Sequence, residues 1–239
     1  SLVGKAFGPI MFIWFTMMAV IGGVYLIQFP EIFKAISPYY AYSLLSSNPN
    51  ALFILGAVFL CTTGAEALYS DLGHCGRANI RISWIYVKIC LLLNYFGQGV
   101  WLWQHQGSTL SPGDNPFFSI MPEWFLIAGI SIATAAAIIA SQAMISGSFT
   151  LISEAVRLNL WPKVRINYPS NQKGQLYVPS INVLLWVGCI IVVLIFRESQ
   201  NMEGAYGLAI NMTFLMTTIL VAEFLKRKKF PNYIIIIFL

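Results

Sequence analysis

The sequence predicts an all-helical, polytopic bundle that spans a lipid membrane. Of its 239 residues, 58% are hydrophobic and only 10% are charged, and the mean hydropathy is +0.72. Soluble domains carry about 25% charged residues, so this chain has too few charges to cover a water-facing surface. The net charge of +5 comes from short basic clusters between apolar runs. Such clusters do not form the continuous basic face that nucleic-acid binding requires.

Six long apolar segments predict the helices of the bundle. They cover about residues 7–29, 51–72, 82–103, 124–147, 178–196 and 204–225, and a shorter apolar run begins at 231. A helix of about 20 residues crosses the hydrocarbon core, and each long segment approaches or exceeds this length. Strands of a membrane barrel would alternate apolar and polar residues, so these continuous runs favour helices. We expect residues 1–239 to form one membrane domain that is a piece of a larger protein, because the last run is too short to cross.

Several local signals refine these segments in chain order. Pro30 closes the first segment, and the second is interrupted by the polar run TTGAE at 62–66. Residues 133–143 of the fourth are rich in Ala, Ser and Thr, which permits close helix packing in lipid. This helix is expected to continue over 147–160 beyond the membrane. Pro179 opens the fifth segment after a polar loop, and Gly204 and Gly207 weaken the start of the sixth.

The placement of Lys and Arg predicts the orientation of the bundle. When loops are assigned alternately to the two sides, eleven basic residues fall on one side and two, Lys34 and Arg197, on the other. Cytoplasmic loops are enriched in Lys and Arg, so the start of the chain is predicted to be cytoplasmic in the plasma or inner membrane. The eleven are Lys5, Arg77, Arg81, Arg157, Lys163, Arg165, Lys173, Lys226, Arg227, Lys228 and Lys229.

Glu66 is the strongest candidate for a functional side chain. An ionisable group at mid-membrane costs roughly 2.5–3.5 kcal/mol on insertion scales, so its presence favours a function. Gly64 permits local unwinding that frees carbonyl groups, and Thr63 would share a face with Glu66 if the segment is helical. These oxygens suit a hard cation, and a buried carboxylate also takes up protons. Glu66 is therefore a candidate cation ligand and proton carrier, the alternative being a glutamate that reaches water at a helix end.

Tyr206 is a second candidate ligand, in the sixth segment. Its hydroxyl lies between Gly204 and Asn211 in an otherwise apolar run and has the chemistry to bind a cation. The alternative is a structural tyrosine of the interfacial aromatic belt.

Other polar residues predict structural roles. Asp71, His74 and Cys75 suggest nucleophilic catalysis, but a polar exit turn explains them better, since adjacent residues do not converge on one substrate. The four cysteines occur singly and favour buried small residues over metal ligands, so no cofactor is expected. Asn94 and Gln98 are spaced to hydrogen-bond across helices, and Glu223 is expected to pair with the basic cluster that follows it.

Several motifs closely resemble the KUP/HAK/KT potassium uptake family. They occur in the family's order over nearly the whole chain: FGP at 7–9, TTGAEALYSDLGH at 62–74, LNYFGQG at 93–99, NPF at 115–117, IASQAMISG at 139–147 and GQLYVP at 174–179. The resemblance implies a LeuT-like architecture of the amino acid–polyamine–organocation (APC) superfamily. It also implies potassium uptake coupled to protons. By this resemblance the chain covers roughly the family's fifth to eleventh spans.

The same resemblance assigns candidate site residues. Thr63 and Glu66 match family site residues on an unwound span, and Tyr206 matches the tyrosine of the family's tenth span. The first-span motif GDIGTSPLY and the acidic residue of the third span do not occur in this chain, so we expect only part of the site here. The expected partners are K+ as transported substrate, H+, the lipid bilayer and the remaining N-terminal spans, while association of identical chains stays open.

Two rival functions follow from the same residues. A superfamily relative that carries amino acids would use similar broken helices, but Glu66 would repel a substrate carboxylate. A membrane-embedded enzyme would depend on Asp71, His74 and Cys75. Potassium transport is the function that the sequence favours, and an enzyme is not expected.

Overall fold

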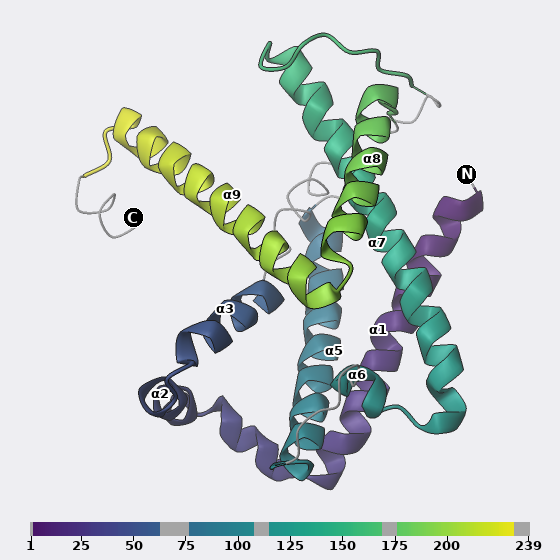
Figure 1. Cartoon of the computed structure of the whole chain (residues 1–239), viewed down its shortest axis with the longest axis vertical. Coiled ribbons are helices and arrows are strands. Elements are labelled where there is room, and N and C mark those ends of the chain that lie inside the picture. The colour runs from purple at the N-terminus through teal and green to yellow at the C-terminus, as the bar shows by residue number, and fades with distance from the viewer. Residues whose placement is uncertain (1, 63–76, 108–114, 169–175, 232–239) are drawn as a thin grey trace. The chain divides into compact units, whose positions relative to one another are not determined.

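The described part of the chain is helical, which confirms the prediction of a helical bundle. The computed structural model describes residues 2–62, 77–107, 115–168 and 176–231, and Figure 1 shows their helices. An isolated antiparallel bridge joins Asn167 and Tyr177. The elements are α1 (Leu2–Gln28), the 3-10 helix η1 (Pro30–Ile36), α2 (Pro38–Ser47), α3 (Ala51–Thr62), α5 (Arg77–Gln104), α6 (Pro116–Ser119), α7 (Glu123–Arg157), α8 (Pro179–Phe196) and α9 (Ser199–Arg227).

Five of these helices are long and apolar enough to cross a membrane, within the ranges that the structure describes. The stretches are Ala6–Gln28, Ala78–Gln104, Glu123–Arg157, Pro179–Phe196 and Asn201–Arg227. They coincide in the chain with the first, third, fourth, fifth and sixth apolar segments. In the second segment, 51–72, helix α3 is described up to Thr62, and the remainder lies outside the described residues, as does the run after 231.

Prolines and polar caps set where several helices begin. Pro30, Pro38 and Pro116 each lie in the first turn of an element. An N–H group in a first turn has no acceptor within the helix, so a proline there costs no hydrogen bond. The Asn115 side chain accepts a hydrogen bond from the Phe117 N–H at 2.9 Å and caps α6. Helix α7 continues to Arg157, so the fourth apolar segment and its polar extension form one helix of 35 residues.

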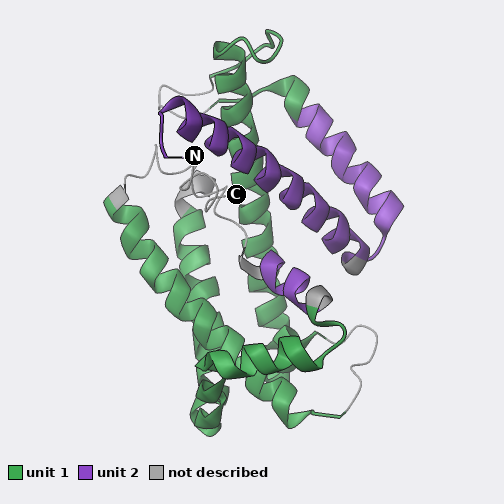
Figure 2. Cartoon of the chain, turned by 90° about the vertical axis from the view of Figure 1, so that its left-hand side faces the viewer, with its two compact units in different colours: residues 1–52, 63–181 green, residues 53–62, 182–239 purple. Residues whose placement is uncertain are grey.

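The chain divides into two compact units, coloured separately in Figure 2. Unit 1 comprises residues 1–52 and 63–181, and unit 2 comprises residues 53–62 and 182–239. In unit 1, α1 packs along α5 and over a shorter stretch against α7. A buried cluster forms its core where α1 meets the segment before α7: Met17, Ile21, Ile120 and Met121.

The crossing of α1 and α5 depends on two glycines. A Cβ added at Gly22 would lie 2.6 Å from the Asn94 Cα and would also collide with the Leu93 carbonyl oxygen. A Cβ added at Gly97 would lie 2.7 Å from the Gly22 carbonyl oxygen. Backbone therefore meets backbone at this crossing, the arrangement that small residues allow between membrane helices.

Unit 2 contains most of α3, most of α8 and all of α9. Gly207 of α9 packs against the side chain of Leu60 in α3, and the rings of Phe59 and Phe214 meet edge to face at 5.6 Å. On α8, large apolar side chains such as Leu184 and Leu194 are mostly exposed. Lipid tails solvate such side chains as well as another helix does, so this surface suits a membrane.

Candidate ion-transport site

The described residues contain one of the three predicted cation ligands. Thr63 and Glu66 lie outside the described residues, and so do Asp71, His74 and Cys75, the group on which the enzyme alternative depends. Helix α3 ends at Thr62, the residue directly before Thr63.

Tyr206 lies in the first third of α9, with 52% of its surface exposed. The helix continues through Gly204 and Gly207, so these glycines do not interrupt it. The Asn211 side chain donates a hydrogen bond to the Gly207 carbonyl oxygen at 2.9 Å, which satisfies this polar amide within its own helix. Tyr206 therefore lies on a continuous helix.

Helices α3 and α9 are in contact within unit 2. Leu60, two residues before the end of α3, packs on Gly207, the residue that follows Tyr206. A Cβ at Gly207 would lie 3.3 Å from the Leu60 Cδ2, so a larger residue would crowd this contact. Within unit 2, the helix end that leads into TTGAE therefore lies beside α9 at the level of Tyr206.

Polar groups inside unit 1 lie along one face of α5. The Tyr86 hydroxyl is 2.7 Å from the Thr16 Oγ1 of α1, and it also donates to the Phe12 carbonyl oxygen at 3.1 Å. This hydrogen bond across helices was not predicted from the sequence. The sequence did contain a pattern that indicates this face of α5, because Tyr86, Cys90 and Asn94 recur every four residues.

Asn94 is buried at the α1–α5 crossing, with 3% of its surface exposed. Its Oδ1 has no hydrogen-bond partner among the described residues. The predicted hydrogen bond across helices is therefore not made by this oxygen, because the facing position on α1 is Gly22, which has no side chain to donate.

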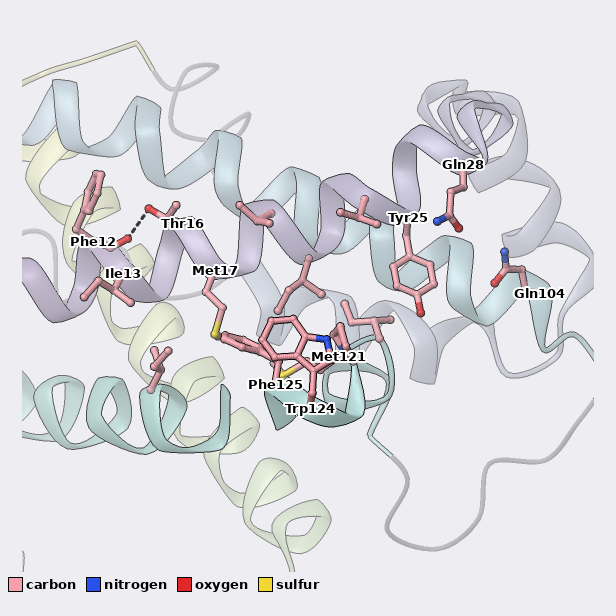
Figure 3. Close-up of a pocket in the computed structure, with 16 residues that line it drawn as sticks. Phe12, Ile13, Thr16, Met17, Tyr25, Gln28, Gln104, Met121, Trp124 and Phe125 are labelled. Carbon is pink, nitrogen blue, oxygen red and sulfur yellow. Dashed lines mark hydrogen bonds between the residues drawn. The ribbon is translucent and has the colours of Figure 1, made fainter. Parts of the chain in front are cut away.

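A groove in unit 1 has a volume of about 890 Å³ (Figure 3). Its walls are mostly apolar, from α1 and from the start of α7. Gln28 and Gln104 lie at one end and Phe12 and Ile13 at the other (Figure 3). A potassium ion needs several oxygen ligands to replace its water, and Met17, Met121 and Phe125 supply none. Oxygen-bearing side chains also line the groove, but Thr16 lies toward one end and Gln28 and Gln104 at the other, so they do not surround one point (Figure 3).

Ion pairs in the described residues lie near helix ends. Arg227 contacts Glu223 at 3.2 Å, which confirms the expected pairing of Glu223 with the basic cluster. Arg157 contacts Glu154 at 2.7 Å at the end of α7. Lys34 donates a hydrogen bond to Glu31 at 3.0 Å, and this carboxylate raises the pKa of the Lys34 ammonium. These charges lie where water or lipid headgroups can solvate them.

Comparison with known proteins gives one consistent result. The family model described as "K+ potassium transporter integral membrane domain" matches residues 1–239. Proteins named "Probable potassium transport system protein Kup" are similar to the chain in three organisms. The Cytophaga hutchinsonii protein is 66% identical over 94% of this chain, the Flavobacterium johnsoniae protein 61% over 99%, and a Clostridium perfringens protein 56% over 100%.

The chain spans about a third of the length of these relatives: 35%, 36% and 37% respectively. No solved structure matches it. The family match covers the whole sequence given and agrees with the motifs at 62–74 and 93–99. The chain therefore belongs to the K+ potassium transporter family, the KUP/HAK/KT family that its motifs resemble.

Proposed function

We propose that this chain forms part of a membrane transporter that imports K+ in symport with H+. The observation that carries the proposal is the family match over residues 1–239. The relatives' printed names describe potassium transport, and transport rather than catalysis is the activity we assign. The membrane-length helices of both units supply the framework that such a protein needs.

The proposed K+ site consists of Thr63, Glu66 and Tyr206. A carboxylate and two hydroxyls offer oxygen ligands, and carbonyl groups freed by unwinding at Gly64 would add more. The family resemblance supports this grouping, because it matches Thr63 and Glu66 to site residues of an unwound span and Tyr206 to the tyrosine of the tenth span. Proton uptake by Glu66 would couple the two fluxes, within a LeuT-like arrangement of the APC superfamily.

The proposed location of the protein is the plasma membrane. In the proposed orientation the start of the chain is in the cytoplasm. Helices α7 and α9 both carry basic residues in their last turn, and both would end on the cytoplasmic side. The opposite side would hold η1, whose single lysine pairs with Glu31.

The test replaces the corresponding segment of the Cytophaga hutchinsonii relative with these 239 residues. That relative is 66% identical over the shared region, so the chimera should assemble. Expression in cells that lack potassium uptake should restore growth at low K+. Glu66→Gln should abolish growth and proton-coupled uptake, while the matched control Glu123→Gln, a residue at the start of α7, should leave both unchanged.

Three results would contradict the proposal. Normal rescue by Glu66→Gln would remove this carboxylate from the mechanism. Competition of uptake by amino acids but not by rubidium would favour the amino-acid carrier. Loss of activity in Cys75→Ala would favour the enzyme alternative, whereas we expect this variant to transport normally.

A further inference from the structure

The C-terminal end of α9 concentrates positive charge. Lys226, Arg227, Lys228 and Lys229 are consecutive, and Phe230 follows them. These five residues are here called the α9 basic end. They lie directly after the apolar stretch of a membrane-length helix.

The hydrogen bonds of the α9 basic end form a defined helix cap. The Phe230 N–H donates to the Leu225 carbonyl oxygen at 3.1 Å, and the Lys229 N–H donates to the Lys226 carbonyl oxygen at 3.0 Å. This pair of bonds is the Schellman motif, whose penultimate residue adopts the left-handed conformation. Lys229 occupies that position with φ +56°.

Helix α7 ends in the same motif with a different residue at the strained position. Leu160 N–H donates to Ala155 O at 2.9 Å and Asn159 N–H to Val156 O at 3.1 Å, and Asn159 has φ +58°. Asparagine tolerates this conformation, whereas a lysine there is unfavourable. Arg197, directly after α8, has the same left-handed conformation with φ +56°, so a basic residue occupies such a position after two of the helices.

Two ammonium groups of the α9 basic end are available to a ligand. Arg227 is paired with Glu223, and the Lys228 Nζ lies 5.8 Å from the centroid of the Phe224 ring. Lys226 and Lys229 have no carboxylate within 4.0 Å among residues 2–62, 77–107, 115–168 and 176–231. Four positive charges against the single Glu223 leave this end with a net charge of about +3.

The surroundings of these charges indicate what they bind. Phe224 and Phe230 are both exposed, so the charged groups border an apolar surface. A soluble acidic partner would gain nothing from side chains at the depth of the lipid tails. In a phospholipid beside the end of a membrane helix, the phosphate lies at the level of the lysines and the tails lie at the level of the phenylalanines.

We propose that the α9 basic end binds the phosphate of an anionic phospholipid through Lys226 and Lys229. The left-handed turn at Lys229 ends the helix and turns the chain at the membrane surface. Lysines near an anionic surface strengthen lipid association roughly fivefold each. This inference depends on α9 being a membrane span and does not depend on which ion is transported.

The experiment reconstitutes the chimera with the Cytophaga hutchinsonii relative in phosphatidylcholine vesicles that contain traces of spin-labelled phosphatidylglycerol or spin-labelled phosphatidylcholine. The measured quantity is the preference of the protein-restricted lipid for phosphatidylglycerol. The double variant Lys226→Gln/Lys229→Asn should lower this preference roughly twofold or more. The measured change is smaller than the change at the two lysines alone, because the label also samples the other lipid contacts of the protein. Asn is chosen at 229 because it retains the left-handed turn.

Controls separate charge from structure. Glu223→Gln/Arg227→Gln removes one charge of each sign and should retain the preference, as should Lys226→Arg/Lys229→Arg. Salt at about 1 M should suppress the preference of the unaltered chain, which tests the charge effect without any substitution. Circular dichroism checks that each variant keeps its helix content.

Three outcomes would overturn the proposal. The first is an unaltered chain with no preference for phosphatidylglycerol. The second is an unchanged preference in Lys226→Gln/Lys229→Asn. The third is displacement of the labelled lipid from the protein by inorganic phosphate but not by chloride at equal ionic strength. This result would identify free phosphate as the ligand.

Discussion

Two helix pairs in this protein each have a glycine contact and an aromatic pair, but they differ in how closely the helices pack. In unit 1, α1 and α5 share a glycine contact and a stacked aromatic pair, Phe12 and Tyr86, with ring centroids 5.4 Å apart. In unit 2, α3 and α9 share a glycine contact and the Phe59–Phe214 pair at 5.6 Å. The ring distances are similar, although one pair is stacked and the other meets edge to face, and the glycine contacts differ more.

The difference shows what a glycine contributes in each pair. At the α1–α5 crossing the missing Cβ lets two backbones touch, and neither backbone can move away without shifting its helix. At the α3–α9 contact the neighbour is the end of a leucine side chain, which can change rotamer. In the first contact the Tyr86 hydroxyl also meets Thr16 and the Phe12 carbonyl of the other helix, whereas Thr213 and Thr217 of α9 bond to carbonyls of their own helix.

The largest expected effect is at the α1–α5 crossing. Gly22→Ala should lower the free energy of unfolding by about 2–3 kcal/mol, because the new methyl group meets backbone atoms of Leu93 and Asn94. Unfolding in mixed micelles of detergent and dodecyl sulfate measures the change.

Gly23→Ala is the matched control for this substitution. A Cβ at Gly23 has nothing within 4 Å, so this variant should be neutral or gain up to about 1 kcal/mol from helix propensity. Equal losses at positions 22 and 23 would mean that the backbone contact does not hold the helices together.

A smaller effect is expected from the hydrogen bond that joins the same helices. Tyr86→Phe keeps the ring stacked on Phe12 but removes the hydroxyl that meets Thr16, and it should cost about 0.6 kcal/mol. Thr217→Val on α9 removes a bond within one helix and should cost less. A loss at Thr217 equal to that at Tyr86 would show that the bond across helices gives no extra stability.

The smallest effect is expected at the α3–α9 contact. Gly207→Ala should change the free energy of unfolding by less than about 1 kcal/mol, since displacement of the Leu60 side chain offsets the gain in helix propensity. Gly204→Ala, with open space around it, should be more stable than Gly207→Ala in the same assay. A loss at Gly207 as large as that at Gly22 would mean that Leu60 is held as rigidly as backbone.

The sequence predicted membrane-length helices, since hydropathy over some 20 residues reflects a requirement that each segment meets alone, but it did not predict the short elements η1, α2 and α6. The pairing of Glu223 with the basic cluster was also predictable, because residues four apart meet on any helix. The Tyr86–Thr16 bond and the groove of unit 1 were missed. Each depends on residues far apart in the chain, and no local pattern records which helices become neighbours.

By itself the sequence determined the class of protein, the family and the candidate ligands Thr63, Glu66 and Tyr206, because composition and motifs are properties of the chain alone. The tertiary structure decided which glycines face another backbone, and that the Asn94 Oδ1 has no hydrogen-bond partner among the described residues. Gly22 and Gly23 are adjacent and identical in type, yet only one faces another backbone. That distinction arises from the rotation of α1 against α5, which is fixed by packing between helices.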